Sequence, residues 1–378
     1  MRAASGIVIA RSEATWRSRE RKARRLLDCF ASLAMTGSVE AITPYPGEPA
    51  PTQASAGRVS LKAMLLYLGQ RIVLFVATLL FASLVVFAVM QILPGDAAQT
   101  MLGPTATPEA VAALSHKLGL DLPAPIRYVR WIGGALHGDL GLSYAYGSPI
   151  GPLIASSLAV SAPLALMAMA LAAIIGLVAG VYAADRRGRA GDAMVMGLSQ
   201  IGIAVPNFWL AILLVLVFAV TLRLVPAGGF PGWHDPARAI AALILPAIAL
   251  GVVQAAIVTR VTRSAVIEAL NEDFMRTARA KGVSRRAALW RHALPNALTP
   301  ILTIMGLQFA NLIASAIVVE NVFVLPGLGR LMLQSISNRD TLVVENGVML
   351  LALIVIGLNF IVDIACAAID PRLRASAA

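Results

Sequence analysis

Long apolar runs separated by short polar segments dominate the chain from residue 64 to residue 374. Six runs have the length of a membrane-spanning helix, about 17–25 residues. They occupy residues 72–93, 158–184, 193–222, 239–259, 297–319 and about 347–369. The first five runs contain no Asp, Glu, Lys or Arg. We therefore predict an all-α polytopic membrane protein with six transmembrane helices.

Three prolines lie inside these apolar runs. Pro206 interrupts the third run, which is long for one span, and predicts a kink or break there. Pro246 and Pro300 lie in the fourth and fifth runs. All three are candidate hinges. Composition agrees with a membrane protein, because only 13% of residues are charged, against about 25% in soluble domains.

The net charge of +11 could indicate a nucleic-acid partner, but its distribution indicates membrane topology. Segments 185–192 and 260–296 carry three and eight Lys or Arg residues, whereas the much longer segment 94–157 carries three. Short loops that are rich in Lys and Arg stay in the cytoplasm. We predict that both termini are cytoplasmic, that 94–157 is periplasmic with short amphipathic helices at 108–118 and 125–136, and that the chain binds no nucleic acid.

The polar stretch 260–296 between the fourth and fifth runs has a strong helical pattern. We expect the fourth span to continue as a helix to about Leu270, and two short helices to follow at 272–281 and 285–293. Acidic residues open the first short helix and basic residues close it, as the helix dipole favours. Gly282 has the position of a C′ glycine, where the chain turns sharply.

This stretch resembles the cytoplasmic coupling loop of permeases from binding-protein-dependent ABC importers. Gly282 stands at the glycine of the coupling motif, Arg276-Thr-Ala278 stands where that motif often reads Glu-Ala-Ala, and Leu294-Pro295 matches its end. Segments 93–143, 320–340 and 359–374 resemble the oligopeptide, dipeptide and nickel branch, so the resemblance covers about residues 64–374. It implies a type I importer permease fold in which the loop docks on an ATPase. The implied contact residues are Glu272, Asp273, Phe274, Arg276, Thr277, Ala278, Gly282, Leu294 and Pro295.

The resemblance also implies the partners. They are a second homologous permease, two cytoplasmic ATP-binding subunits and a periplasmic solute-binding protein, all at the bacterial inner membrane. We expect no ATPase site, cofactor or metal in this chain, with ATP and Mg²⁺ on the partner subunits. None of its four lysines follows a glycine, as a phosphate-binding loop requires, and its histidines show no metal-ligand spacing. Peptides are the expected cargo, with nickel and short oligosaccharides or opines as alternatives.

Charged residues after the fifth run form another candidate site. Glu320, Arg330, Arg339 and Asp340 surround a Pro-Gly turn, and we expect them to face outward. They would pair with one another or contact the soluble partner. Asp363 is the one acidic residue well inside a span, and such a group is a functional candidate by default. Pairing or snorkelling near the helix end is the preferred interpretation over a substrate or proton role.

Residues 1–63 do not conform to the rest. They contain a basic run at 17–25 and a Pro/Ala/Ser-rich stretch, and Met64 opens the segment that resembles the family. We interpret 1–63 as a start-site artefact or a disordered extension. The competing function is a self-contained secondary transporter or channel, which would show mid-membrane ionisable residues or an internal repeat. An intramembrane protease would need paired acids or a His-Glu-x-x-His motif.

Overall fold

The computed structural model describes residues 61–92, 97–103 and 105–369. Residues 1–60 of the predicted extension 1–63, residues 93–96, residue 104 and residues 370–378 lie outside this part of the chain. Every regular element in the described residues is a helix, and one isolated bridge joins Leu142 to Pro149. The all-α prediction is confirmed.

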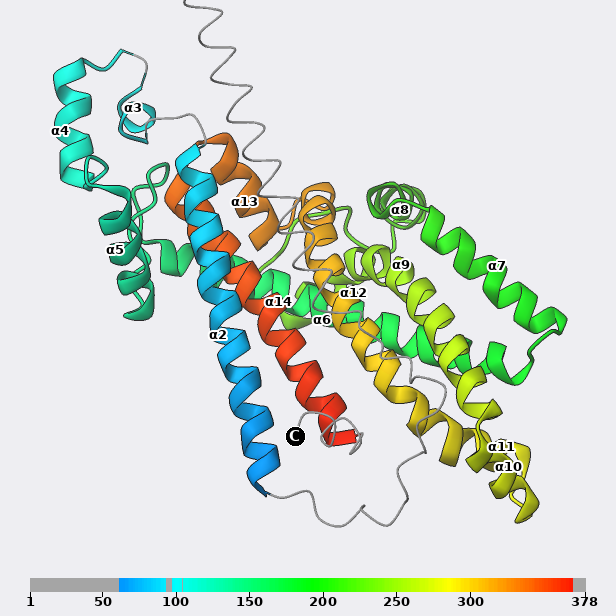
Figure 1. Ribbon diagram of the computed structural model, residues 1–378. Coiled ribbons are helices and arrows are strands. Elements are labelled where there is room, and N and C mark those ends of the chain that lie inside the picture. The colour runs from blue at the N-terminus through cyan, green and yellow to red at the C-terminus, as the bar shows by residue number, and fades with distance from the viewer. Residues whose placement is uncertain (1–60, 93–96, 104, 370–378) are drawn as a thin grey trace, which may run out of the picture.

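The long helices form a bundle whose two ends carry different short helices (Figure 1). The long helices are α2 (Leu61–Ile92), α6 (Ile150–Asp185), α9 (Pro236–Asn271), α12 (Leu294–Val322) and α14 (Thr341–Ile369). The short elements at one end are α3 (Ala97–Leu102), α4 (Pro108–Leu118), α5 (Ala124–Leu136) and α13 (Leu328–Ser337). Those at the opposite end are α10 (Asp273–Ala280) and α11 (Arg285–Ala288), followed by the π-helical turn η3 (Leu289–Ala293).

The five long helices all have the length and apolarity to cross a membrane. The third predicted span is divided into α7 (Ala190–Ala204) and α8 (Asn207–Leu214), which continues as the π-helical turn η2 (Val215–Thr221). The two halves meet at 97°. Pro206 precedes α8 at this bend. It has no N–H to donate and disfavours a helical residue before it, so the predicted break is confirmed.

Small residues allow α6 and α9 to pack closely. A Cβ on Gly176 would come within 2.5 Å of the Val258 side chain, and one on Gly180 equally close to Thr262. On the facing side, a Cβ on Gly251 would lie 2.8 Å from the Ala168 carbonyl oxygen. In lipid, apolar burial gives little drive for helix association, so close van der Waals contact of this kind holds helices together.

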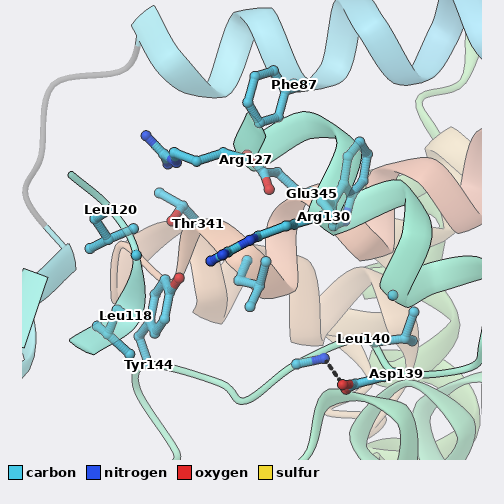
Figure 2. Close-up of a pocket in the computed structure, with 15 residues that line it drawn as sticks. Phe87, Leu118, Leu120, Arg127, Arg130, Asp139, Leu140, Tyr144, Thr341 and Glu345 are labelled. Carbon is cyan, nitrogen blue, oxygen red and sulfur yellow. Dashed lines mark hydrogen bonds between the residues drawn. The ribbon is translucent and has the colours of Figure 1, made fainter. Parts of the chain in front are cut away.

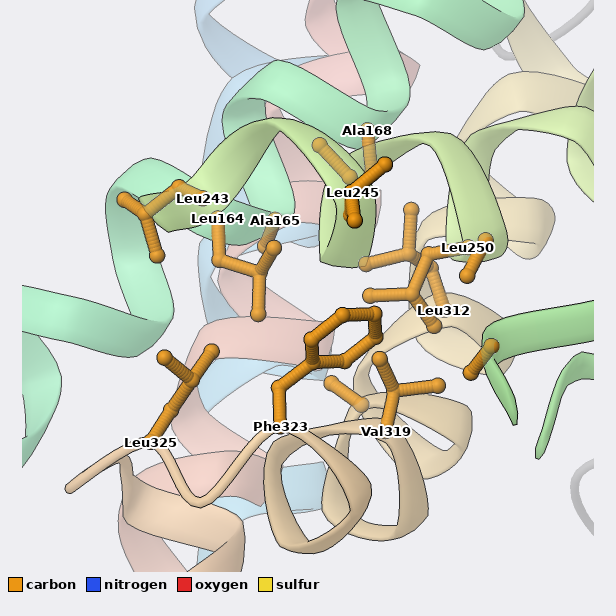
Figure 3. Close-up of a cluster of buried hydrophobic side chains, with 14 of the residues drawn as sticks. Leu164, Ala165, Ala168, Leu243, Leu245, Leu250, Leu312, Val319, Phe323 and Leu325 are labelled. Atoms are coloured by element: carbon orange, nitrogen blue, oxygen red, sulfur yellow. The ribbon is translucent and has the colours of Figure 1, made fainter. Parts of the chain in front are cut away.

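A second layer of packing joins α6, α9 and α12. The Phe323 ring, which directly follows α12, lies among side chains from all three helices (Figure 3). Leu164, Leu243 and Leu312 in this cluster are fully buried. The cluster fixes the bundle from which the short helices project at either end.

Candidate functional site

The coupling loop predicted at 260–296 lies at the end of the bundle, where α10 projects beyond the long helices (Figure 1). The helix α9 runs on to Asn271, as expected, and α10 begins two residues later. The second short helix is also confirmed, as α11 and η3 together span Arg285–Ala293 and lead into α12.

The end of α10 is fixed by backbone hydrogen bonds. The Gly282 N–H donates to the Arg279 carbonyl and the Val283 N–H donates to the Ala278 carbonyl, the pattern of a Schellman cap. Gly282 has φ +84°, and no atom lies within 4 Å of where its Cβ would be. Its requirement for glycine is therefore conformational rather than steric. Ser284 then caps α11 by accepting a hydrogen bond from the Ala287 N–H.

One side chain holds α10 against the bundle. Met275 is 2% exposed and packs with Val266 and Ala269 of α9 and Leu289 of η3. Its neighbour Phe274 is 40% exposed. Sequence reasoning selected Phe274 and missed Met275, because nothing local distinguishes which of two adjacent apolar residues faces the bundle.

The other selected residues of α10 lie on its exposed side or at its ends. Glu272 and Thr277 are exposed, and Ala278 is half-buried. Arg276 forms an exposed ion pair of 3.2 Å with Asp273, which contributes less than about 1 kcal/mol at such a site. The outward face of α10 thus presents the apolar ring of Phe274 beside the hydroxyl of Thr277, and charged side chains border both.

Two ion pairs connect this region to the end of α6 and the start of α7, and sequence reasoning identified neither. Asp192 is 5% exposed and accepts two hydrogen bonds from Arg263, at 2.5 and 2.7 Å. Bidentate arginine–carboxylate pairs fix orientation as well as distance. Arg285 contacts Asp185 at 3.2 Å. Segment 260–296 is therefore attached to α6 and α7.

Leu294 and Pro295 begin α12. Leu294 packs against the same cluster as Met275, while Pro295 is exposed and lies just after the π-helical turn η3, which runs directly into α12. Of the other candidate hinges, Pro246 is buried within α9 and Pro300 lies within α12.

The expectation that Glu320 and Asp340 face outward is wrong. Glu320 is 1% exposed and accepts hydrogen bonds from the Ser161 hydroxyl and from the N–H groups of Gly329 and Arg330. A Cβ on Gly327 would overlap its carboxylate, so this glycine makes room for the buried acid.

Asp340 is also fully buried. It accepts hydrogen bonds from the Ser143 hydroxyl and the Ala145 N–H, and so ties the α5–α6 connection to the start of α14. Arg339 is exposed and Arg330 half-buried, and these two remain candidates for contact with a soluble partner.

Asp363 is paired, as the preferred interpretation expected, although its partner is not in a loop. It contacts Arg71 of α2 at 2.5 Å. Phe75 and Phe360 pack one turn further along the same helix pair, with ring centroids 5.3 Å apart. The acid therefore helps to join α2 to α14.

Two matches to family descriptions cover most of the chain. Residues 176–375 match the binding-protein-dependent transport system inner membrane component. Residues 64–165 match the N-terminal part of the membrane components of such systems.

Several relatives are similar over nearly their whole length. A protein named as a peptide transport system permease of Brucella abortus (strain 2308) is 40% identical over 306 residues, which are 81% of this chain and 98% of that protein. The glutathione transport system permease protein GsiC of Escherichia coli (strain K12) is 39% identical, covering 82% of this chain and 99% of the relative. The dipeptide transport system permease protein DppB of Alkalihalophilus pseudofirmus is 36% identical, covering 82% and 100%.

Proposed function

This chain belongs to the family of binding-protein-dependent transport system inner membrane components, and from this membership we propose which residues couple it to its ATPase and what it carries. It is a multi-pass inner-membrane permease of an ABC importer. Membership of this family implies that the chain functions together with ATP-binding subunits and a binding protein. We propose that it forms half of the pathway for peptides, since its relatives are named for peptide, dipeptide and glutathione transport.

The exposed face of α10 is proposed to dock on a cytoplasmic ATP-binding subunit. The observation that carries this proposal is the pairing of Phe274, 40% exposed, with Met275, 2% exposed, on a helix beyond the bundle end. Met275 fixes the helix, and the preceding residue, Phe274, presents a large apolar group to the cytoplasm. Hydrophobic anchors surrounded by polar groups are typical of protein interfaces.

The movement of α10 would reach the pathway through its attachments. Met275 contacts α9, η3 continues into α12, and Asp192 of α7 pairs with Arg263 of α9. Closure of two ATP-binding subunits on ATP would draw two such helices together, biasing a two-state permease toward one conformation. Pro206, Pro246 and Pro300 stay candidate hinges for this change. ATP and Mg²⁺ would be held by the partner subunits, and this chain would bind no cofactor.

The proposed topology places α10 and both ends of the transmembrane segment in the cytoplasm. The start of α2 and the end of α14 lie toward the same end of the bundle as α10 (Figure 1). The basic residues of segment 260–296 favour that side. The α4 and α5 helices would then be periplasmic.

Purification of the tagged chain from native membranes in mild detergent, with mass spectrometry of the bound proteins, tests the composition. We expect two ATP-binding subunits and a second permease in the wild-type sample. Phe274→Ala should lower recovery of the ATP-binding subunits, while Leu224→Ala, which removes a 69% exposed apolar side chain far from α10 in sequence, should not. A chain recovered without any ATP-binding subunit would contradict the proposal.

A further inference from the structure

A cavity of about 230 Å³ lies between α2, α5 and α14, at the end of the bundle opposite α10. Phe87 of α2, Arg127 and Arg130 of α5, and Glu345 of α14 contribute to its wall, with Tyr144 from the following connection. Figure 2 shows both guanidinium groups and the Glu345 carboxylate around this space. The volume is below the roughly 300–1,000 Å³ of a site for a drug-sized molecule. It suits a compact charged group.

Glu345 is the unusual member of this wall. It is 6% exposed, yet its carboxylate forms no hydrogen bond or ion pair with any residue in the described ranges. A buried carboxylate without a donor is costly. By contrast, the other two buried acids at this end, Glu320 and Asp340, each accept several hydrogen bonds.

Both arginines of the cavity wall have N–H groups that form no hydrogen bond within the described residues. Arg127 gives one hydrogen bond to Gln91, and the side chain of Arg130 makes no hydrogen bond or ion pair within the described residues. Burial is the main cause that raises the pKa of Tyr144, and the Glu345 carboxylate adds to it, so the phenol stays a neutral donor. The cavity thus offers one carboxylate for a cation and two guanidinium groups for an anion.

The position of the cavity along α2 and α14 indicates its depth in the membrane. Glu345 lies two residues before the apolar run of α14, and Phe87 lies near the end of the apolar run of α2. Tyr128 and Trp131 surround Phe87, with ring centroids 5.4 and 6.3 Å away. Tyrosine and tryptophan concentrate at the membrane–water interface, at the level of lipid headgroups. Below this level, Leu80 and Leu84 of α2 are about half exposed and apolar.

We propose that this cavity binds the headgroup of a phospholipid that carries a primary ammonium beside its phosphate, as phosphatidylethanolamine does. The ammonium would donate hydrogen bonds to Glu345, and the phosphate would accept them from Arg127 and Arg130, since guanidinium groups match phosphate geometry. The acyl chains would lie along the apolar face of α2. The assignment depends on the membrane position of the chain and not on its cargo or its ATPase contact.

Native mass spectrometry of the intact transport complex tests the assignment. The complex is delipidated and incubated separately with phosphatidylethanolamine, phosphatidylcholine and phosphatidylglycerol of the same acyl composition. Phosphatidylcholine has no ammonium N–H, and phosphatidylglycerol has no cation. We expect at least about fivefold more bound phosphatidylethanolamine than either competitor, which a difference of about 1 kcal/mol supplies.

Variants separate the two halves of the site. Glu345→Gln should abolish the preference for phosphatidylethanolamine over phosphatidylcholine, and Arg130→Gln should weaken all three lipids. Arg339→Gln, exposed at the same end but outside the cavity, should leave the binding of all three lipids unchanged. Equal retention of the three lipids by the wild type, or an unchanged preference in Glu345→Gln, overturns the proposal.

Two further results of the lipid-binding experiment also bear on the proposal. If the Glu345→Gln complex fails to assemble, the binding of the three lipids to Arg130→Gln decides whether the cavity is the lipid site. Arg130 is exposed, so its replacement leaves the bundle intact. Displacement of the lipid by the free dipeptide alanyl-alanine would assign the cavity to a soluble zwitterion and refute the lipid site.

Discussion

Replacement of Gly282 by valine should disconnect ATP hydrolysis from uptake without preventing membrane insertion. Gly282 is at φ +84°, and the space that a Cβ would enter is open to at least 4 Å, so the cost of a side chain lies in the backbone alone. A residue with a Cβ in this conformation costs roughly 1–2 kcal/mol, and a β-branched residue lies at the upper end or beyond. About 2 kcal/mol shifts a local equilibrium by roughly 30-fold.

That cost removes about half of the free energy that holds α10 in place. Burial of the Met275 side chain supplies about 1.5–3 kcal/mol, and the two Schellman hydrogen bonds add about 1 kcal/mol each. The valine variant should therefore raise the fraction of molecules in which α10 is released by roughly 30-fold. The bundle around Phe323 does not contact Gly282, so insertion and the amount of permease should be unchanged.

The assay is ATP-dependent uptake of a labelled dipeptide into proteoliposomes that contain the complete importer, with ATP hydrolysis measured in parallel. We expect Gly282→Val to lower uptake at least tenfold per ATP hydrolysed. Gly282→Asn is the matched control, because asparagine tolerates the left-handed conformation, and it should keep more than half of wild-type uptake. Wild-type uptake in the valine variant, or an equal loss in both variants, would refute the conformational reasoning.

Three further changes probe the other attachments. Glu320→Ala leaves buried donors without an acceptor, a penalty of about 1–3 kcal/mol, and should lower the thermal unfolding temperature of the purified complex. An unchanged temperature would contradict a stabilising role for the buried carboxylate. Asp192→Asn and Arg263→Gln should each reduce coupled uptake. The fold-loss of uptake in the double variant should be smaller than the product of the two single fold-losses, because the same ion pair is broken in all three variants. A double fold-loss equal to that product would argue against the pair. Asp363→Asn should retain most uptake in the same proteoliposome assay, because the acid joins α14 to Arg71 of α2; abolished uptake with normal assembly would indicate a proton or substrate role instead.

Local features of the coupling loop were predictable because they depend on neighbours in sequence. The end of α10 at Gly282 follows from one residue type at one backbone angle, and the break at Pro206 follows from a missing N–H. Helices α4 and α5 were predicted to within one residue for the same reason.

Burial of the acids could not be predicted in the same way. Glu320 reaches Ser161, a residue 159 positions earlier, and Asp340 reaches Ser143, 197 positions earlier. A carboxylate near a turn looks exposed until the fold brings such donors to it. One signal was present: Gly327 and Gly329 lie where side chains would collide with Glu320, and a Pro-Gly-x-Gly segment after an acid indicates free N–H groups close to it.

Site-specific photo-crosslinking at position 274 most directly tests whether α10 is the contact with the ATPase. A photoreactive phenylalanine analogue replaces Phe274 in the complete importer, and the same analogue replaces Val129, which is 67% exposed on α5 at the opposite end. Position 274 should crosslink to an ATP-binding subunit, with a yield that changes when ATP is added, and position 129 should not. Absence of that crosslink at 274 in an assembled, transport-active complex would contradict the proposed coupling.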